Sequence, residues 1–158
     1  MSVYRRFPSE ELPSLVTTNT LARQPIFRSR DTCELFLRIL YEVRVETGFQ
    51  LLAFSIMPDH VHLVLVPGEQ NLGRILQLIK GRFSRACNKT QRQSGPLWQN
   101  RYHERALKSE AALFRAMDYV HTNPVVARLA AEPEDYPWSS ASGQFATDLD
   151  AYFGQAEA

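Results

Sequence analysis

The chain has 158 residues, a formal net charge of +1, 44% hydrophobic residues and 22% charged residues. This length and balance are typical of one globular domain and exclude a disordered chain of low hydrophobicity. No apolar run reaches the roughly 18 residues of a membrane-spanning helix, and the two cysteines, Cys33 and Cys87, match no zinc or redox spacing. We therefore expect a cytoplasmic protein with two reduced thiols and no membrane partner.

Three strands and one helix are expected in the first half of the chain. Residues 15–21 are few and rich in β-branched side chains, which favours a strand. Asp31 and Glu34 have the spacing of a capping box, and apolar residues then repeat at helical period until a glycine closes the segment. Residues 49–57 and 61–66 are apolar runs of strand length, and the Pro-Asp pair between them predicts a tight hairpin.

Two helices and one strand are expected in the second half. Asn71 is placed to cap the first helix. Its buried stripe consists of Leu72, Ile75, Leu76, Ile79 and Phe83. A polar loop over residues 91–96 leads to a strand over residues 102–107. The second helix starts near Ser109 and should end one residue before Pro124, because proline disfavours helical backbone in the preceding residue.

The order strand, helix, strand, strand, helix, strand, helix predicts an α+β protein. We expect a ferredoxin-like β-α-β-β-α-β antiparallel sheet with both helices on one face, and an additional C-terminal helix. Residues 1–141 would form one domain and residues 142–158 an acidic C-terminal tail, with the Tyr-Pro-Trp segment at 136–138 docked on the body. This fold hosts many functions, so it identifies none by itself.

Positive charge is concentrated in the middle of the chain. Residues 70–128 carry 11 of the 18 basic side chains and only 3 of the 17 acidic ones. The stretch over residues 70–103 contains no carboxylate, and its cations are Arg74, Lys80, Arg82, Arg85, Lys89, Arg92 and Arg101. Such a cluster indicates a polyanionic partner such as DNA, although a solvated helix face is the alternative. On the helix, Lys80, Arg82, Arg85 and Lys89 are the expected main phosphate contacts.

Two histidines begin the strand that follows the predicted hairpin. His60 and His62 flank Val61, and side chains two apart on a strand share a face, roughly 7 Å apart along it. Two imidazoles so placed can converge on one divalent metal ion and leave room for a third ligand. A purely structural pair is the alternative, but polar rings on a buried strand need partners.

A tyrosine lies off the apolar stripe of the last predicted helix. That stripe consists of Leu113, Phe114, Met117 and Val120. Tyr119 falls on the other side of the helix, and Asn123 follows one turn later on the same face. These two residues are candidates for a site, whereas the alternative is a half-exposed tyrosine with Asn123 as a helix C-cap.

The histidine pair and the tyrosine together fit one reaction. A tyrosine hydroxyl, with a reference pKa near about 10, is a poor nucleophile at neutral pH. A divalent ion that polarises a phosphate makes its attack feasible. The expected product is a covalent phosphotyrosine link that preserves the energy of the phosphodiester, so a DNA strand can be rejoined without ATP.

Three segments resemble the single-tyrosine HUH transposases, and most closely their REP-associated tyrosine transposase branch. They are residues 52–64 with the two histidines, residues 96–104, and residues 118–125 with the tyrosine. Residues 17–20 and 137–140 fit the same branch. The resemblance covers roughly residues 15–141, and the combination of motifs is far more specific than any one of them.

The resemblance implies roles for individual residues. His60 and His62 would bind Mg²⁺ or Mn²⁺, and Tyr119 would be the nucleophile that forms a 5′-phosphotyrosine intermediate. Asn123 would be the third ligand, at a position where some relatives have glutamine, and His121 is its rival. The oxygen preference of magnesium favours Asn123.

The resemblance also implies a substrate and partners. The expected substrate is single-stranded or hairpin DNA at palindromic repeats, which places the enzyme at the nucleoid. A homodimer is an open expectation, since some relatives are dimers that share active sites. Two other classes stay open from the residues alone: a non-catalytic nucleic-acid-binding module of ferredoxin-like fold, and a small metal-dependent hydrolase or metal-binding regulator.

Overall fold

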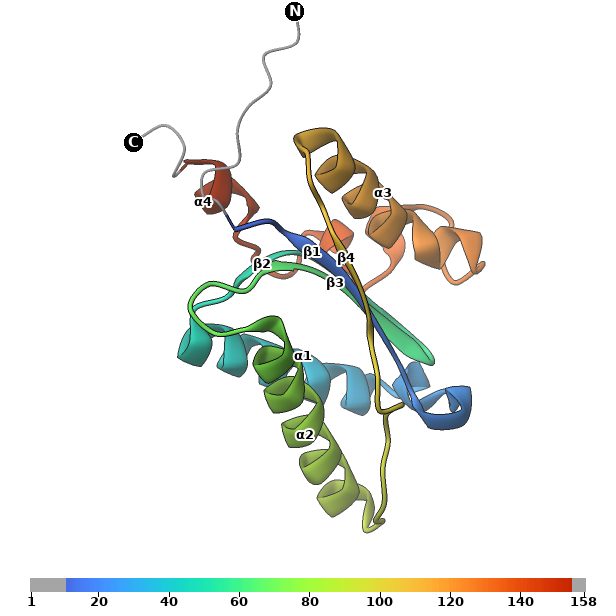
Figure 1. Cartoon of the computed structure of the whole chain (residues 1–158). Helices are drawn as coiled ribbons and strands as arrows, with labels where there is room; N and C mark the ends of the chain where they lie inside the picture. The colour runs from blue at the N-terminus through green and yellow to red at the C-terminus, as the bar shows by residue number, and fades with distance from the viewer. Residues whose placement is uncertain (1–10, 155–158) are drawn as a thin grey trace, which may run out of the picture.

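The computed structural model describes residues 11–154, in which a four-stranded sheet is covered by helices on both faces (Figure 1). The strands are β1 (Ser14–Asn19), β2 (Gln50–Met57), β3 (His60–Val66) and β4 (His103–Ala106). The α-helices are α1 (Arg30–Thr47), α2 (Leu72–Gln91), α3 (Glu110–Val126) and α4 (Leu149–Gly154). Short 3₁₀ turns are η1 (Leu21–Arg23), η2 (Ile26–Arg28), η3 (Pro133–Asp135) and η4 (Ser140–Ser142). None of the helices within residues 11–154 is long and apolar enough to cross a membrane.

The sheet has the strand order β2-β3-β1-β4, and every neighbouring pair is antiparallel. This is the predicted ferredoxin-like arrangement, so the fold prediction is confirmed. Helices α1 and α2 pack together on one face, and α3 lies on the other face, mainly against β2 (Figure 1). The molecule therefore has two cores, one on each side of the sheet.

The alternation of side chains along β3 fixes which face carries the histidines. Its odd-numbered residues are buried against α1 and α2, whereas Val64 and Val66 are buried against α3. Because a slip of one residue would exchange these faces, the two cores hold the register of β3 firmly. His60 and His62 continue the even-numbered row, so both side chains face the α3 side of the sheet.

The first helix does not start with the predicted capping box. Ser29 occupies the N-cap of α1 without a side-chain hydrogen bond, and Asp31 is already inside the first turn. Glu34 instead accepts a hydrogen bond from Arg30 at 2.8 Å. A capping box needs its first residue in extended backbone, and here that position falls two residues before Asp31. The cap predicted for α2 is confirmed, since the side chain of Asn71 accepts a backbone N–H in its first turn.

Helix α3 runs three residues beyond its predicted end at Asn123. Pro124 lies inside the helix, and the C-cap is Ala127, whose backbone N–H donates to the Asn123 carbonyl at 2.9 Å. A proline so close to the helix end removes only one backbone hydrogen bond, and its buried ring compensates with packing. Asn123 is therefore a helical residue and not a C-cap, which leaves its side chain available for another role.

The segment after α3 closes the outer edge of β2. The backbone N–H of Ile56 donates to the carbonyl of Trp138 at 2.8 Å, and that of Phe54 donates to the hydroxyl of Ser140 at 3.0 Å. The phenol of Tyr136 donates to the Ile56 carbonyl at 2.6 Å. The predicted docking of the Tyr-Pro-Trp segment is therefore confirmed, and it satisfies an edge that would otherwise expose unpaired backbone groups.

Residues 142–154 also pack on the body. Asp148 accepts hydrogen bonds from both the Arg44 guanidinium and the backbone N–H of Leu51, and Tyr152 in α4 is fully buried. Burial opposes ionisation of Asp148, but the hydrogen bonds from Arg44 and Leu51 outweigh it and hold the pKa of the carboxyl below its ordinary value. An ionised Asp148 thus ties this segment to α1 and β2.

Replacing Asp148 with asparagine should lower the free energy of unfolding by about 1–3 kcal/mol at neutral pH, the usual range for hydrogen bonds to a charged group. The folded-state pKa is lowered, so this stabilisation is present above the unfolded pKa of roughly 3.9 and is lost as pH falls below it. Urea denaturation at pH 7 and near pH 3 should therefore show a difference between parent and Asp148→Asn that shrinks on acidification. Asp150→Asn, at an exposed position in α4, is the control. An equal loss in both variants would refute this role for Asp148.

Candidate active site

His60 is oriented by the carboxylate that precedes it. Its Nδ1 lies 2.7 Å from Asp59 Oδ1, and Arg23 Nε donates to Asp59 Oδ2 at 3.0 Å. Burial opposes ionisation of Asp59, but the hydrogen bonds from Arg23 and His60 outweigh it and lower the pKa of this carboxyl. An ionised carboxylate only accepts, so His60 Nδ1 carries the proton that it donates. The other ring nitrogen, Nε2, then has a lone pair for a metal ion.

His62 presents a buried nitrogen without a partner. Its Nδ1 lies 2.8 Å from the hydroxyl of Thr17 on β1, its cross-strand neighbour. Its Nε2 is inaccessible to water and makes no hydrogen bond within the described part of the chain. Burial, together with the charges of His60 and Arg23, lowers the pKa of His62 to about 4, so the ring is neutral at pH 7. A buried ring nitrogen without a partner is costly, and a metal ion would satisfy it in the tautomer that carries its proton on Nδ1.

The two imidazoles lie close enough to act on one ligand. Their ring centroids are 4.7 Å apart and their planes are nearly perpendicular. Residues 11–154 contain no group of three His, Cys, Asp or Glu side chains placed to hold a metal ion. An amide side chain is therefore the natural candidate for a third protein ligand. The pair fits a divalent ion that also keeps positions for water or substrate.

Tyr119 stands beside the histidine pair. Its ring centroid is 5.3 Å from that of His62, and the residue is 51% exposed. Helix α3 is anchored through its buried residues Leu113, Ala116, Met117, Val120 and Pro124. Tyr119 lies off this stripe, as the helical spacing predicted. Phe114, which was predicted to belong to the stripe, is exposed and stacks on Phe153 instead, so that prediction was wrong.

Asn123 and His121 point to different parts of the molecule. Asn123 lies one turn after Tyr119 and lines a hollow of about 490 Å³ together with His60. We name it the His60 hollow; its lining includes Arg23, Arg28, Asp59, His60, Asn123 and Leu129. His121 Nε2 lies 2.7 Å from the Ser140 hydroxyl, and burial lowers the pKa of its ring. Asn123 rather than His121 therefore faces the side of the sheet end where His60 lies.

A second hollow of about 290 Å³ lies against Tyr119 on the β4 side. Thr17 and Leu15 of β1 and His103 and Arg105 of β4 line it. His103 pairs with Thr17, and Thr17 pairs with His62, so a row of polar residues crosses the sheet from β4 to β3. Space for a small part of a substrate is thus present beside the tyrosine.

Sequence reasoning missed Asp59, Thr17 and Arg23. Asp59 could have been found, because a carboxylate directly before a candidate metal-binding histidine is well placed to orient its ring. Thr17 depends on the pairing of β1 with β3, which a single sequence does not reveal. Arg23 depends on the conformation of the η1 turn, and no local motif in the sequence indicates that conformation.

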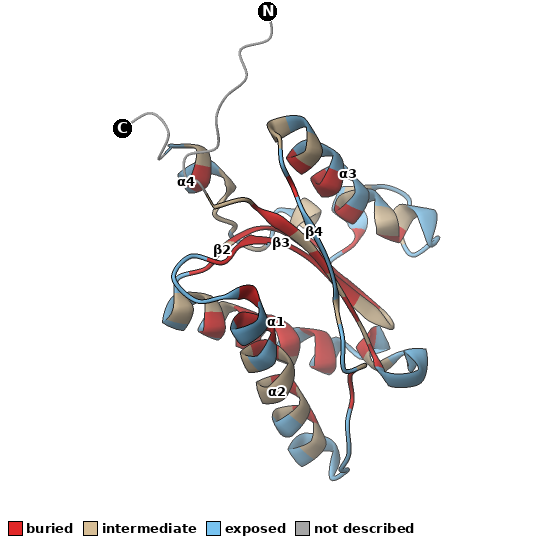
Figure 2. Ribbon diagram, in the orientation of Figure 1, coloured by how far each residue is buried: buried red, intermediate tan, exposed pale blue. Residues whose placement is uncertain are grey.

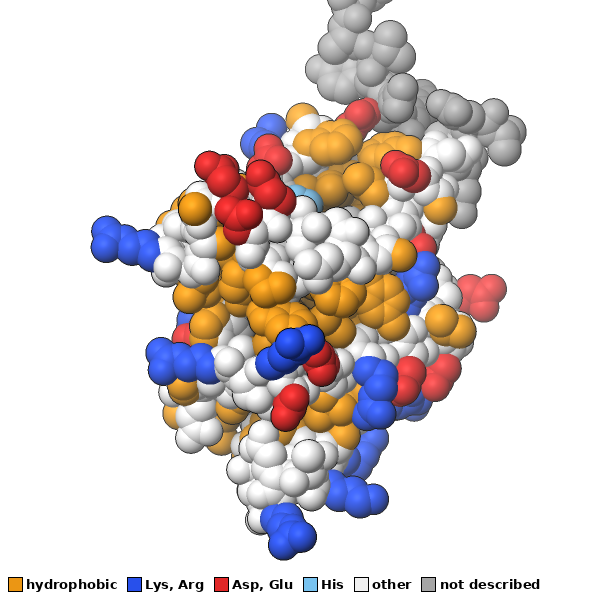
Figure 3. All heavy atoms as spheres, turned by 180° about the vertical axis from the view of Figure 1, so that it is seen from behind, with side chains coloured by type: hydrophobic (Ala, Val, Ile, Leu, Met, Phe, Trp, Pro, Cys, Tyr) orange, Lys and Arg blue, Asp and Glu red, His pale blue; other side chains and the backbone are white. Residues whose placement is uncertain are grey.

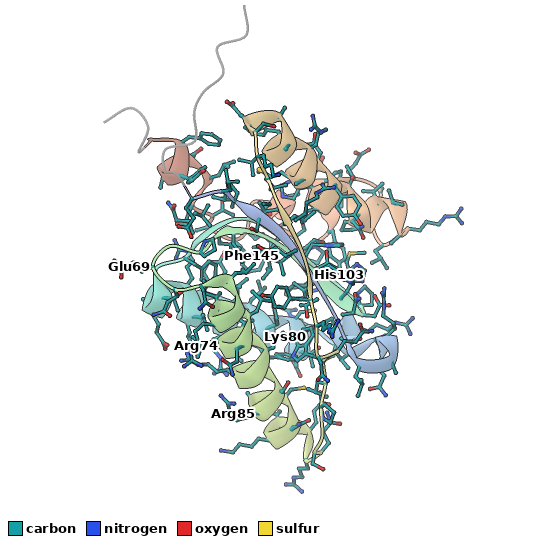
Figure 4. The ribbon with its side chains drawn as sticks, in the orientation of Figure 1. Glu69, Arg74, Lys80, Arg85, His103 and Phe145 are labelled. Carbon is teal, nitrogen blue, oxygen red and sulfur yellow. The ribbon has the colours of Figure 1, made fainter. Side chains whose placement is uncertain are left out.

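Two of the four predicted phosphate contacts on α2, Lys80 and Arg82, already have partners within the protein. Lys80 Nζ donates to the carbonyl of Gln99 at 2.9 Å, and burial lowers the pKa of its amine. Arg82 turns the other way and donates two hydrogen bonds to Glu46 of α1, at 2.8 and 2.6 Å. The cations that remain exposed are Arg74, Arg85, Lys89, Arg92 and Arg101. Figure 4 shows Arg74 and Arg85 on the side of α2 away from Lys80.

The basic helix and the tyrosine lie on opposite faces of the sheet. Helix α2 packs with α1, whereas α3 carries Tyr119 on the other side (Figure 1). Seen from behind, Lys and Arg side chains gather at the lower end of the molecule, where α2 ends, and a group of carboxylates lies at its upper end (Figure 3). The predicted phosphate contacts therefore lie away from the tyrosine.

Salt titration of DNA binding should distinguish the free cations from the engaged ones. A cation that contacts a single strand releases about 0.7 ion, so Arg85→Ala/Lys89→Ala should reduce the slope of log affinity against log salt by about 1.4. Lys80→Ala/Arg82→Ala removes the same charge from residues that Gln99 and Glu46 already engage, so its slope should change less. If the parent and the Arg85→Ala/Lys89→Ala variant give equal slopes of log affinity against log salt, these two residues of α2 do not contact DNA.

Comparison with known proteins identifies the family. The family described as "Transposase IS200 like" matches residues 15–123, from β1 to Asn123. This chain belongs to the IS200-like transposase family. The matched range contains both histidines, Tyr119 and Asn123, so the whole candidate site of this transposase lies within it.

Two curated relatives are REP-associated tyrosine transposases. The protein from Escherichia coli K12 is 24% identical over 142 residues, which cover 89% of this chain and 82% of the relative. A protein of the same description from Haemophilus influenzae is 29% identical over 103 residues, and the chain spans only 58% of its length. The prediction of this branch from three short segments is thus confirmed.

Two solved structures share the fold of this transposase. A REP-associated tyrosine transposase bound to a REP hairpin superposes with a TM-score of 0.72 at 23% identity, over 94% of this chain and 93% of that one. A transposase from Deinococcus radiodurans gives a TM-score of 0.54 at 21% identity, over 76% of this chain and 95% of that one. The described architecture is therefore that of the family.

Proposed function

We propose that this transposase cleaves and rejoins single-stranded DNA beside palindromic hairpins through a covalent link to Tyr119. The observation that carries the proposal is an exposed tyrosine whose ring lies 5.3 Å from His62, a residue with a buried and unpartnered Nε2 within the described structure. A non-catalytic DNA-binding module has no use for this arrangement. The proposal therefore favours an enzyme over the binding module.

The reaction follows from the groups present. The hydroxyl oxygen of Tyr119 attacks the scissile phosphorus, a phosphotyrosine bond forms, and the bond to the 3′ oxygen breaks. The phenol loses its proton and the 3′ oxygen gains one, so the products are a 5′-phosphotyrosine and a free 3′ hydroxyl. Attack by another 3′ hydroxyl reverses the step and rejoins DNA.

His60, His62 and Asn123 are the residues that would hold Mg²⁺ or Mn²⁺. The lone pairs of the two Nε2 atoms and the amide oxygen of Asn123 are suitable donors. A bound divalent ion would polarise the scissile phosphate and neutralise developing charge. Asp59 and Thr17 hold the imidazoles in position through their Nδ1 atoms, at 2.7 and 2.8 Å.

Hairpin DNA is the proposed substrate because a structural relative is bound to a REP hairpin. All four proposed site residues come from one chain, so a monomer can complete the site without a partner subunit. The exposed cations of α2 would contact phosphates of the hairpin or its flanks. A substrate of this kind places the enzyme at the nucleoid.

The test is a search for a denaturant-resistant adduct. Synthetic DNA hairpins of repeated palindromes, labelled and carrying single-stranded flanks, are incubated with the protein and Mg²⁺ or Mn²⁺. A labelled protein band on a denaturing gel that disappears with excess chelator is the expected result. Tight binding without any adduct would instead identify a non-catalytic DNA-binding module.

A further inference from the structure

We propose that Arg23, with Arg28 beside it, binds a backbone phosphate adjacent to the scissile one and holds the DNA strand in the His60 hollow. This inference rests on the proposed function, since it assigns a strand position to the same site. Neither arginine belongs to the basic stretch of residues 70–103.

Arg23 is held in an unusual backbone conformation. Ala22 and Arg23 both have a φ of 54°, so two consecutive residues other than glycine adopt the left-handed region. Such residues are uncommon and cost energy, and they persist where surrounding contacts enforce them. The enforcing residue is Thr20, which is buried and whose hydroxyl lies 2.8 Å from the Gln24 carbonyl and 3.0 Å from the Asp59 carbonyl. The turn is thereby fastened to the hairpin that carries His60.

The guanidinium of Arg23 is fixed at one nitrogen and free at the others. Nε donates to Asp59, while the side chain stays 51% exposed. Nη2 lies 3.5 Å from His60 Nδ1, but both atoms carry protons because His60 donates to Asp59, so this contact is not a hydrogen bond. The Nη groups therefore have donors left for a ligand. Their planar fork matches two oxygens of a phosphate.

The His60 hollow has the charge and lining for such a ligand. The lining contains two arginines, Arg23 and Arg28, and one carboxylate, Asp59, whose oxygens already accept from Arg23 and His60. Arg28 is exposed and has no ion pair within residues 11–154. Apolar groups such as Leu129 complete the wall. His60, one of the proposed metal ligands, lines the same hollow. An anion in this hollow would therefore lie next to the proposed catalytic centre.

A scan with neutral phosphates tests the proposal. Methylphosphonates replace one phosphate at a time along the single-stranded flank of a hairpin substrate, and both equilibrium binding and adduct formation are measured. At one position next to the cleavage site, neutralisation should weaken binding by the parent about 10-fold, as expected for a charge-assisted contact. Arg23→Ala should show the same loss with normal DNA and almost no further loss with that methylphosphonate.

Further variants separate a phosphate contact from a purely structural role. Arg23→Lys keeps the positive charge but lacks the two planar Nη groups. Compared with Arg23→Ala, it should therefore recover part of the sensitivity of DNA binding to that methylphosphonate. Asp59→Asn disturbs the support of His60 and should reduce adduct formation while the sensitivity of binding to that phosphate remains. Arg38→Ala, at an exposed position of α1, is the control for net charge.

Two results would overturn the proposal, and they differ from failure of the proposed function. The Arg23→Ala substitution and a methylphosphonate each lower the affinity for DNA by some factor. If these two factors multiply at every position of the scan, the two changes act independently and Arg23 contacts no phosphate. If the Arg23→Ala and Arg38→Ala variants bind DNA equally, its charge has only a general effect. Absence of any adduct with the parent would refute the catalytic role of Tyr119, while the binding data would still decide the role of Arg23.

Discussion

Replacing Tyr119 with phenylalanine should abolish the covalent adduct between this transposase and DNA. The substitution removes one oxygen, and without it the proposed reaction has no nucleophile. Because the residue is 51% exposed and its hydroxyl makes no hydrogen bond within residues 11–154, the free energy of unfolding should change by less than about 0.5 kcal/mol. Denaturing gels with labelled hairpin DNA measure the adduct, and urea denaturation checks the fold.

Binding measurements complete this test. Tyr119→Phe should bind hairpin DNA within about 2-fold of the parent, because an uncharged group contributes little to phosphate contacts. Tyr102→Phe is the matched control, since Tyr102 is a partly exposed tyrosine just before β4. It should form the adduct as the parent does. An active Tyr119→Phe variant would show that the nucleophile is another residue.

Alanine at His60 or at His62 should reduce cleavage by at least about 100-fold, since loss of one ligand removes most of the function of a metal site. DNA binding should be largely retained. His62 is only 2% exposed, so His62→Ala leaves a cavity, and His62→Leu provides a second variant that fills more of the space and has no donor for a metal ion. Titration calorimetry with Mn²⁺ on the parent and both variants measures the metal site without relying on cleavage.

The two α3 residues that compete as third ligand give the control for this experiment. Asn123→Ala should weaken Mn²⁺ binding, because its side chain shares the hollow with His60. His121→Ala should leave it unchanged, because that ring bonds to Ser140 instead. The opposite pattern would reassign the ligand, and full cleavage in excess chelator would refute metal dependence altogether.

The sequence predicted the placement of His60, His62 and Tyr119 because each of them lies outside a periodic apolar pattern. Val61, Leu63 and Leu65 define one face of β3, so the histidines had to share the other face. The stripe of α3 likewise left Tyr119 outside the core. The antiparallel order of strands also followed from the sequence of elements, since a β-α-β-β-α-β chain of this length has few compact arrangements.

What the sequence did not predict depends on contacts between distant segments. The support of His62 comes from Thr17 of β1, and Arg23 of the η1 turn binds the carboxylate that supports His60; no local pattern encodes either contact. The prediction of Lys80, Arg82, Arg85 and Lys89 as the main phosphate contacts overlooked that Lys80 and Arg82 lie about 200° apart around a helix. Their partners, Gln99 and Glu46, lie on different segments. Pro124 failed as a helix terminator because its position near the end made its cost small.

The placement of α2 and α3 on opposite faces has a consequence for where DNA can be cut. Residues 136–148 close the β2 edge, whereas β4 is exposed along its whole length (Figure 2). A strand that touches both the cations of α2 and Tyr119 must pass round the β4 edge or round the sheet end at the His60 hollow. The dimensions of the protein would then set the spacing of the cut. The number of nucleotides between the hairpin and the cleavage site would be determined by the thickness of the sheet and its helices. If nucleotides are inserted between the hairpin and the original cleavage site, the cut should therefore stay at nearly the same distance from the hairpin.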